Sequence, residues 1–520
     1  MAGQRAPMVK RQRFIDQFMD NFAESGEIIF DVRDKSSISL AVLKEKIEAV
    51  SRFFRIIRHS KEDKAVLFLD NSIDFVVILL ALIDENIVIV PLNPGLNEEK
   101  VRYLAGHAQA KFLITSPAIM GRHGWVKELG CRVISTQEVF QPPAAAGKAV
   151  RVACHEPSRA KDLKLLLYTS GTVGSPKGVM VSKQALRLKV LGLIALLKFK
   201  KGSTFFSFLP FFSGHGMIPG MLVPLLSGCK IYIAAFDPFL SFGFWDLVKE
   251  YRINSFTSVP SVLALLKERI GDTTRVDLKC VRAVYCASSP LPQVMYDWYA
   301  DHLGLHVRNC YGLTEAISWV SVNMNPGRRT KACCVGRPFI GDIAAFDGEG
   351  RRLDHHETGE LGVRSACLMA GYFKDMKATR GCLRKDGYMK TGDVGFIDAK
   401  GSVHILDRIK HLIIKNGINV HPSEVDQVFL GHPDVKDALT FGVLDEHYGE
   451  KIVTALILKE AFRSREKYFS YAAQKLAKFL VPHDIFFLEE FQRGATGKAL
   501  VESIRYRYLT KGKENVVRDS

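Results

Sequence analysis

Hydrophobic and polar positions near the start of the chain alternate between two periods, one typical of helices and one typical of strands. The spacing of apolar residues predicts an amphipathic helix over Leu40–Ile57 and a fully buried helix over Ile73–Ile83. Short apolar runs predict strands at Ala65–Leu69 and Ile87–Leu92, and prolines end the second of them. A strand–helix–strand rhythm of this kind favours layers of α/β structure.

The same alternation continues over residues 163–406, with more glycine turns, and the pattern changes after Asp407. A short basic stretch there precedes two strand signals and one helix signal, at Val435–Leu444, Ile452–Lys459 and Tyr468–Phe479. We therefore predict an α/β protein of two domains. Residues 1–406 form a large N-terminal domain of layered α/β subdomains, and residues 407–520 form a small C-terminal α+β domain.

Composition narrows the class of protein. Apolar residues make up 47% and charged residues 24% of the chain, which is the balance of a folded protein rather than of a disordered one. The longest clean apolar run, Phe75–Ile83, is about half as long as a membrane span, and the basic N-terminus lacks the apolar stretch of a secretory signal. None of the ten cysteines belongs to a Cys-x-x-Cys pair. We therefore expect reduced thiols, no zinc site, no membrane span and a cytoplasmic location.

The charge balance of the chain is strongly basic. It carries 72 Lys and Arg against 55 Asp and Glu, a net charge of +17. Such a field favours anionic partners, although its commonest source is a solvated basic surface. The sequence has no basic stripe interleaved with aromatic residues and no nucleic-acid-binding motif, so we expect no nucleic-acid partner.

The candidate chemistry begins at a loop rich in glycine and hydroxyl groups. An apolar run over Lys164–Tyr168 predicts a strand that leads into it. The loop then presents Thr169, Ser170, Gly171, Thr172, Gly174 and Lys177. Glycines let backbone N–H groups approach a polyphosphate, hydroxyls donate to its oxygens, and a lysine adds a positive charge. Lys177 is followed by Gly178 rather than by Ser or Thr, so the loop is not a Walker P-loop.

This loop resembles the signature loop of the adenylate-forming (AMP-binding) superfamily, which includes acyl- and aryl-CoA ligases such as 4-coumarate–CoA ligase, and luciferases. Val173 departs from the family pattern, which usually has a hydroxyl or acidic residue there, and its side chain offers no contact to phosphate. Further family motifs follow in the family's order, and the resemblance covers nearly all of residues 35–510. It implies that the small C-terminal domain is mobile and turns about a hinge at Lys410.

A second motif resembles the family's Tyr-Gly-x-Thr-Glu segment and contains Asn309, Tyr311, Gly312, Thr314 and Glu315. The resemblance implies that these residues bind the nucleotide, with Tyr311 near adenine and Thr314 at a phosphate. It also implies that Glu315 and Thr172 hold Mg²⁺. A carboxylate beside a triphosphate makes sense only through a metal ion, because the two anions would otherwise repel each other.

Three later residues complete the implied nucleotide site. Asp393 ends a Thr-Gly-Asp strand, and the resemblance implies that it accepts hydrogen bonds from the ribose hydroxyls. Arg408 belongs to an Asp-Arg-x-Lys motif and is implied to contact the ribose as well. Lys498 lies in the family's C-terminal motif, whose lysine contacts the substrate carboxylate and the α-phosphate. Gln492 stands where the family has a proline, and we expect it to loosen the loop that carries Lys498.

Residues 208–228 resemble the family's acyl-pocket helix, and the implied pocket residues are Phe212, Ser213, His215, Ala287, Ser288 and Gly312. His215 stands where amino-acid-activating members have an aspartate that pairs with the α-ammonium group. An unpaired buried ammonium group is costly, so an α-amino acid substrate is disfavoured. The aromatic residues of this stretch favour an aryl or medium aliphatic acid. Ser213 replaces the histidine of many CoA ligases, which leaves the acceptor less certain.

The resemblance implies an acid–thiol ligase that works in two half-reactions. A carboxylic acid attacks the α-phosphate of ATP to give an acyl-adenylate, while Lys498, Lys177 and the Mg²⁺ held by Glu315 neutralise the developing charge. The acyl group then passes to the thiol of coenzyme A. Three alternatives stay open: loading of an acidic acyl carrier protein, transfer to an amine, and nucleotide binding without catalysis.

Overall fold

The structure is a computed structural model, and it describes residues 13–22, 26–57, 59, 63–85, 87–141, 162–169, 176–235, 237–270, 278–327, 330–416, 418–445, 447–460, 464–494 and 499–515. The chain divides into two compact units. The first unit holds residues 1–169 and 178–236, and the second holds residues 170–177 and 237–520. The domain boundary predicted between residues 406 and 407 lies inside the second unit and stays a prediction.

The first unit contains two groups of mostly parallel strands. One follows the order β8-β7-β4-β3-β5-β6, and the other follows the order β9-β10-β1-β2. The strands are β1 (Glu27–Asp31), β2 (Ser36–Ser39), β3 (Lys64–Phe68), β4 (Val88–Pro91), β5 (Phe112–Thr115), β6 (Arg132–Ser135), β7 (Leu163–Thr169), β8 (Lys177–Ser182), β9 (Thr204–Ser207) and β10 (Lys230–Ile233). The helices are α1 (Leu40–Ile56), α2 (Ile73–Asp84), α3 (Glu98–Ala108), α4 (Pro117–Arg122), α5 (Thr136–Phe140), α6 (Lys183–Leu197), α7 (Gly214–Met217) and α8 (Val223–Leu226).

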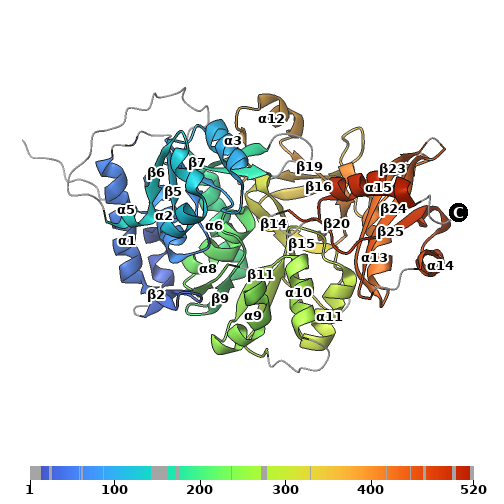
Figure 1. Ribbon diagram of the computed structural model, residues 1–520, viewed down its shortest axis with the longest axis horizontal. Coiled ribbons are helices and arrows are strands. Elements are labelled where there is room, and N and C mark those ends of the chain that lie inside the picture. The colour runs from blue at the N-terminus through green and yellow to red at the C-terminus, as the bar shows by residue number, and fades with distance from the viewer. Residues whose placement is uncertain are drawn as a thin grey trace, which may run out of the picture. The chain divides into compact units, whose positions relative to one another are not determined.

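The two helices predicted from apolar spacing are present, and each begins at a serine cap. The Ser39 hydroxyl accepts a hydrogen bond from the N–H of Val42 at the start of α1, and the Ser72 hydroxyl accepts one from the N–H of Phe75 at the start of α2. Nearly every residue of α2 is buried, because α1 and a sheet cover it, and Figure 1 shows α1, α2 and α5 together in blue and cyan. The continuous apolar run of α2 therefore marks a core helix.

A π-helical turn joins α7 to α8. The turn spans Ile218–Leu222, so the backbone stays helical over Gly214–Leu226 in spite of Pro219 and Pro224. A proline removes one backbone donor, and a π-helical turn is one way to accommodate the ladder bond that is lost. This segment is the one that resembles the family's acyl-pocket helix.

The second unit is built on a long mixed sheet of strand order β11-β12-β13-β14-β15-β20-β19-β17-β16. Strands β11 to β13 are parallel, and the remaining neighbours are antiparallel. The strands of this sheet are β11 (Ser255–Ser258), β12 (Ala283–Cys286), β13 (Arg308–Leu313), β14 (Ser318–Val322), β15 (Cys334–Pro338), β16 (Asp342–Phe346), β17 (Gly359–Arg364), β19 (Met389–Ile397) and β20 (Val403–Arg408). The short strand β18 (Gly371–Tyr372) lies outside this sheet. The helices of this part are α9 (Pro238–Glu250), α10 (Pro260–Ile270), α11 (Gln293–Leu303) and α12 (Met376–Cys382).

The last part of the second unit is a smaller sheet covered on both faces. Its strands are β21 (Ile413–Lys415), β22 (Ile418–Val420), β23 (Val435–Asp445), β24 (Gly449–Leu458) and β25 (Asp484–Phe487), and its helices are α13 (Pro422–Leu430), α14 (Arg465–Lys475) and α15 (Val501–Asn515). On β24, Ile452 and Leu456 pack with α13 and α14, whereas Val453 and Ala455 pack with α15 (Figure 1, orange and red). Side chains alternate between the faces of a strand, so burial on both faces gives the continuous apolar run seen in the sequence.

The described residues bear out the α/β prediction, and most predicted elements lie within a few residues of observed ones. In the described part of the chain no helix is long and apolar enough to cross a membrane, and no group of three or more His, Cys, Asp or Glu could hold a metal ion. No disulfide joins the described cysteines.

Candidate active site

The predicted phosphate loop is described only at its two ends. Strand β7 is buried over Leu165–Leu167 and delivers Thr169, and Lys177 opens strand β8. Ser170, Gly171, Thr172 and Gly174 lie outside the described residues, as does Lys498. The contributions predicted for these five residues therefore stay predictions from the motif.

Asp393 is the centre of a hydrogen-bonded group in the second unit. The Tyr311 hydroxyl donates to its Oδ2 at 2.6 Å, and the Arg408 Nε donates to its Oδ1 at 2.6 Å. Strands β19 and β20 place Asp393 directly opposite Arg408, and β13 supplies Tyr311. Asp393 is only 5% exposed and Tyr311 only 8%. The structure thus brings together three residues that the sequence predicted to bind the nucleotide.

Electrostatics keep this group in a defined protonation state. Burial, followed by the negative charge of Asp393, raises the pKa of Tyr311 well above its usual value, so Tyr311 stays a hydroxyl donor. Burial disfavours the charged form of Arg408, but Asp393 outweighs it and raises the pKa of Arg408. Each carboxylate oxygen of Asp393 has a second lone pair, so both can still accept a hydrogen bond from a ligand hydroxyl.

Glu315 has a fixed partner that the sequence did not point to. The Tyr372 hydroxyl donates to Glu315 Oε1 at 2.8 Å, and the Lys177 Nζ lies 5.0 Å from the centre of the Tyr372 ring. The backbone N–H of Tyr372 donates to Thr379 Oγ1 at 2.9 Å, which holds the backbone of the tyrosine in place. Burial and then the charge of Glu315 raise the pKa of Tyr372. In sequence, the Gly-Tyr-Phe stretch around Tyr372 is typical of packing and turns. The only hint of its role was the tyrosine hydroxyl, which needs a hydrogen-bond partner when it is buried.

The donor set around Glu315 suits Mg²⁺. Magnesium ions in proteins prefer oxygen ligands and are commonly held by one or two carboxylates together with substrate phosphates. Glu315 supplies such a carboxylate, and its Oε1 is oriented by a neutral hydroxyl rather than neutralised by a cation. Lys177 lies over the ring of the same tyrosine, and its ammonium group can attract phosphate.

Tyr372→Phe is expected to lower the apparent affinity for Mg²⁺ by about tenfold, because a residue that orients a metal ligand has effects of this size. Rates at saturating Mg²⁺ should largely recover, which a general loss of structure would not produce. The matched control is Tyr388→Phe, whose hydroxyl donates to Asp342, another carboxylate of the same unit. Titration of the adenylation rate with Mg²⁺ checks both variants, and an equal shift in the two would rule out an orienting role for Tyr372.

The other residues of the Tyr-Gly-x-Thr-Glu motif are tightly constrained. The Asn309 side chain donates to the backbone carbonyl of Ala332. Thr314 opens a short 3₁₀ turn, Thr314–Ala316, whose first carbonyl accepts from the N–H of Ile317. A Cβ atom at Gly312 would lie 2.2 Å from the carbonyl oxygen of Ser318, so this position requires a glycine.

The predicted acyl-pocket residues fall into both units. Phe212, Ser213 and His215 belong to the first unit, and Ala287, Ser288 and Gly312 belong to the second. The Ser213 hydroxyl accepts from the N–H of Gly216 at 3.1 Å and donates to the Pro210 carbonyl at 2.8 Å, so it caps α7. Burial lowers the pKa of His215 to about 3, and its imidazole is therefore neutral at physiological pH.

Ala287 and Ser288 follow the carboxyl end of β12. Ala287 is buried, and Ser288 has a φ angle of +77°, a left-handed conformation that is strained for a residue with a side chain. Such strain is often kept at binding sites, and the role of Ala287 and Ser288 in the acyl pocket stays a prediction.

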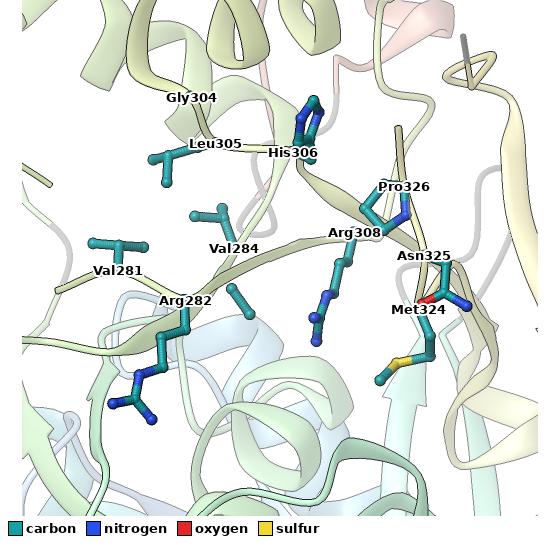
Figure 2. A pocket seen from close by; sticks show the side chains of 11 residues that line it. Val281, Arg282, Val284, Gly304, Leu305, His306, Arg308, Met324, Asn325 and Pro326 are labelled. Atoms are coloured by element: carbon teal, nitrogen blue, oxygen red, sulfur yellow. The ribbon is translucent and has the colours of Figure 1, made fainter. Parts of the chain in front are cut away.

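A cavity of about 380 Å³ lies at the opposite end of the same strands. Its lining includes Arg282, Val284, His306 and Arg308 at the amino ends of β12 and β13 (Figure 2). Most of the motif residues, Tyr311, Gly312 and Thr314 among them, lie toward or beyond the carboxyl ends of these strands, where ligands bind in parallel α/β sheets. This cavity is therefore distinct from the predicted nucleotide and acyl sites.

The loop that carries Lys498 is anchored at both ends. Leu500 N–H donates to the Gln492 carbonyl at 2.8 Å, and the Ser503 hydroxyl donates to Gln492 Oε1. Arg493 pairs with Ala499 in a β-bridge and forms an ion pair with Asp437 on β23. The Gln492 side chain ties the amino-terminal end of this loop to Ser503 of α15, and the looseness expected from the missing proline stays a prediction for the loop itself. Lys410 lies in a 3₁₀ turn, Ile409–His411, between β20 and β21, and its hinge role stays a prediction.

Comparisons with known proteins agree with these motifs. A family model described as "AMP-binding enzyme" matches residues 16–373, and one described as "AMP-binding enzyme C-terminal domain" matches residues 424–498. The chain belongs to the AMP-binding enzyme family, as its sequence motifs predicted.

Individual relatives extend the match over most of the chain. The chain is 28% identical to the oxalate–CoA ligase of Arabidopsis thaliana over 92% of this chain and 95% of that protein. It is 27% identical to the sulfoacetate–CoA ligase of Cupriavidus necator, over 83% and 85% of the two chains. Among solved structures, an ATP-bound RpMatB–BxBclM chimera superposes with a TM-score of 0.83 at 25% identity and covers 95% of this chain and 98% of its own. The predicted fold, a large N-terminal and a small C-terminal domain, is confirmed.

Proposed function

We propose that this chain activates a carboxylic acid with ATP and transfers the resulting acyl group to the thiol of coenzyme A. The observation that carries the proposal is the buried carboxylate of Asp393, which Tyr311 and Arg408 hold from two sides. This arrangement presents a fixed pair of acceptors of the kind that two ribose hydroxyls need. The CoA ligases among the relatives support the choice of acceptor.

The first half-reaction brings two anions together, and the chain has groups to offset their charge. In the proposal the substrate carboxylate attacks the α-phosphorus and pyrophosphate leaves, while Lys498 and Lys177 stabilise the charge that develops on the phosphate oxygens. Glu315 and Thr172 would hold Mg²⁺, which supplies further positive charge to the phosphates when it is bound. Asp393 and Arg408 would position the nucleotide for this attack.

We propose an aryl or medium aliphatic acid as the substrate. The oxalate and sulfoacetate ligases act on acids with a second anionic group, which calls for a positive partner in the pocket. The proposed pocket residues of this chain, Phe212, Ser213 and His215, include no such partner, because His215 stays neutral and the Ser213 hydroxyl caps a helix. A single carboxylate on an apolar body fits these residues better.

The test is a panel of acids incubated with the full chain, ATP and Mg²⁺, with and without CoA. The panel holds aryl acids, medium-chain fatty acids, and oxalate and sulfoacetate as dianionic controls. Pyrophosphate release and a CoA thioester identified by mass would support the proposal. Adenylate without thioester would point to a carrier protein or an amine acceptor. Turnover of the dianionic acids alone would overturn the proposed substrate class, and ATP binding without pyrophosphate release from any acid would overturn catalysis.

A further inference from the structure

A cysteine, a histidine and an aspartate lie in a row on the sheet of the second unit. The Cys333 Sγ lies 3.7 Å from His404 Nδ1, and His404 Nε2 lies 3.1 Å from Asp398 Oδ2. Cys333 immediately precedes β15, and the hairpin of β19 and β20 supplies Asp398 and His404. The residues proposed for acid activation do not include any of the three.

The imidazole of His404 is held in one orientation. The Phe396 ring stacks on it with centres 4.5 Å apart and planes 4° apart. Asp398 is fixed in turn, because its Oδ1 accepts from the N–H groups of Lys400 at 2.9 Å and Ser402 at 2.8 Å. This leaves Oδ2 for the histidine. Proteins activate a thiol or hydroxyl by placing a base beside it and a further residue that orients the base.

The charges of the three side chains agree with Asp398 orienting His404 and His404 acting as the base for Cys333. Burial raises the pKa of Asp398, but the backbone N–H of Ser402 and the side chain of His404 outweigh it, so that the net pKa is lowered and the carboxylate is charged. The charged carboxylate of Asp398 accepts a hydrogen bond from the Nε2–H of His404. The lone pair of Nδ1 then faces Cys333. Burial, followed by the neighbouring Cys334, raises the pKa of Cys333. Its thiol therefore depends on a base, and His404 is within reach.

Access to the sulfur is partial. Cys333 and the side chains of His404 and Asp398 are all partly exposed, the last two by 12% and 21%. Two other partly exposed cysteines have different surroundings: the thiols of Cys280 and Cys382 donate to backbone carbonyls of Val248 and Thr379. A carbonyl oxygen cannot remove a thiol proton, so these two cysteines serve as internal references.

We propose that Cys333 is a thiol–disulfide exchange site for small disulfides, with His404 as its base and Asp398 as the residue that orients His404. His404 takes the proton from Sγ, and the thiolate attacks one sulfur of the disulfide. The new bond joins Cys333 to that sulfur as the original S–S bond breaks. The departing thiolate takes the proton from His404, so the protein thiol is oxidised and half of the small molecule is reduced. This site is separate from acid activation.

The test uses the full chain with glutathione disulfide at pH 7, without ATP, acid or CoA. The rate of modification of each cysteine is followed by peptide mass analysis. We expect Cys333 to react at least about tenfold faster than Cys280. His404→Gln should lower the Cys333 rate by about 100-fold and Asp398→Asn by about tenfold, while the Cys280 rate stays unchanged.

Controls separate activation from simple exposure. If His404→Gln opens the fold, the Cys280 rate will rise, and Asp398→Asn in the partly exposed turn then provides the decisive variant. Cys334→Ser should leave the Cys333 rate unchanged, which excludes attack by the neighbouring thiol. A wild-type Cys333 no faster than Cys280, or a Cys333 rate unaffected by both His404→Gln and Asp398→Asn, would overturn the proposal.

Discussion

Replacing Lys498 with alanine is expected to slow adenylate formation by about 100- to 1000-fold, because removing one group that stabilises developing negative charge has effects of this size. Transfer of the acyl group from a supplied adenylate to CoA should change little, since the charge on the α-phosphate decreases in that step. The loop ends stay anchored by Gln492 and by the ion pair between Arg493 and Asp437, so the fold should persist. Pyrophosphate release and single-turnover thioester formation measure the two steps separately.

A matched control distinguishes this role from a general effect of charge. Lys475, at the end of α14, is an exposed lysine in the same part of the chain, and Lys475→Ala removes the same charge. We expect both half-reactions of that variant to stay near the wild-type rate. Equal losses in the two half-reactions of Lys498→Ala would contradict the assigned role.

Asp393→Asn is expected to weaken ATP binding by about 30-fold, which corresponds to the loss of one hydrogen bond to a charged group. The variant keeps the size of the side chain but removes the negative charge that faces Arg408, so the guanidinium is left unpaired in a half-buried position. We also expect the free energy of unfolding to decrease by about 1–3 kcal/mol. Isothermal titration with ATP and denaturant unfolding measure the two effects.

Two variants show which part of the loss belongs to the carboxylate. Tyr311→Phe removes only the hydroxyl that donates to Asp393 Oδ2, and its loss of ATP affinity should be smaller. Asp347→Asn removes a partly exposed aspartate that forms an ion pair with Arg351 at 2.8 Å, and it should leave ATP affinity unchanged. If Asp393→Asn bound ATP as tightly as the wild type, the ribose contact would be excluded.

Local patterns predicted the elements of the fold well, because burial leaves a periodic trace in the sequence. The helix predicted over Ile73–Ile83 is α2, Ile73–Asp84, and the strand predicted over Val435–Leu444 is β23, Val435–Asp445. The π-helical turn over Ile218–Leu222 had no such trace, since its residues are simply buried. Pro219 lies within the turn, and the backbone accommodates it without leaving the helical path.

Motifs predicted residues of the candidate site but not their neighbours. Tyr311, Asp393 and Arg408 came from three separate motifs, and the sheet brings them into contact. Tyr372 was missed because it contacts Glu315 from a distant position in the chain, and a single pair of this kind leaves no periodic signal. The row of Cys333, His404 and Asp398 was missed for the same reason.

The close approach of two backbones at Gly312 limits how this protein can change over evolutionary time. Every other amino acid would place a Cβ atom 2.2 Å from the Ser318 carbonyl and 2.6 Å from Trp319 Cα, and neither of these backbone atoms can turn aside like a flexible side chain. A library randomised at this codon should therefore return glycine among its functional members. Sequence variation in this motif must therefore enter at positions other than Gly312.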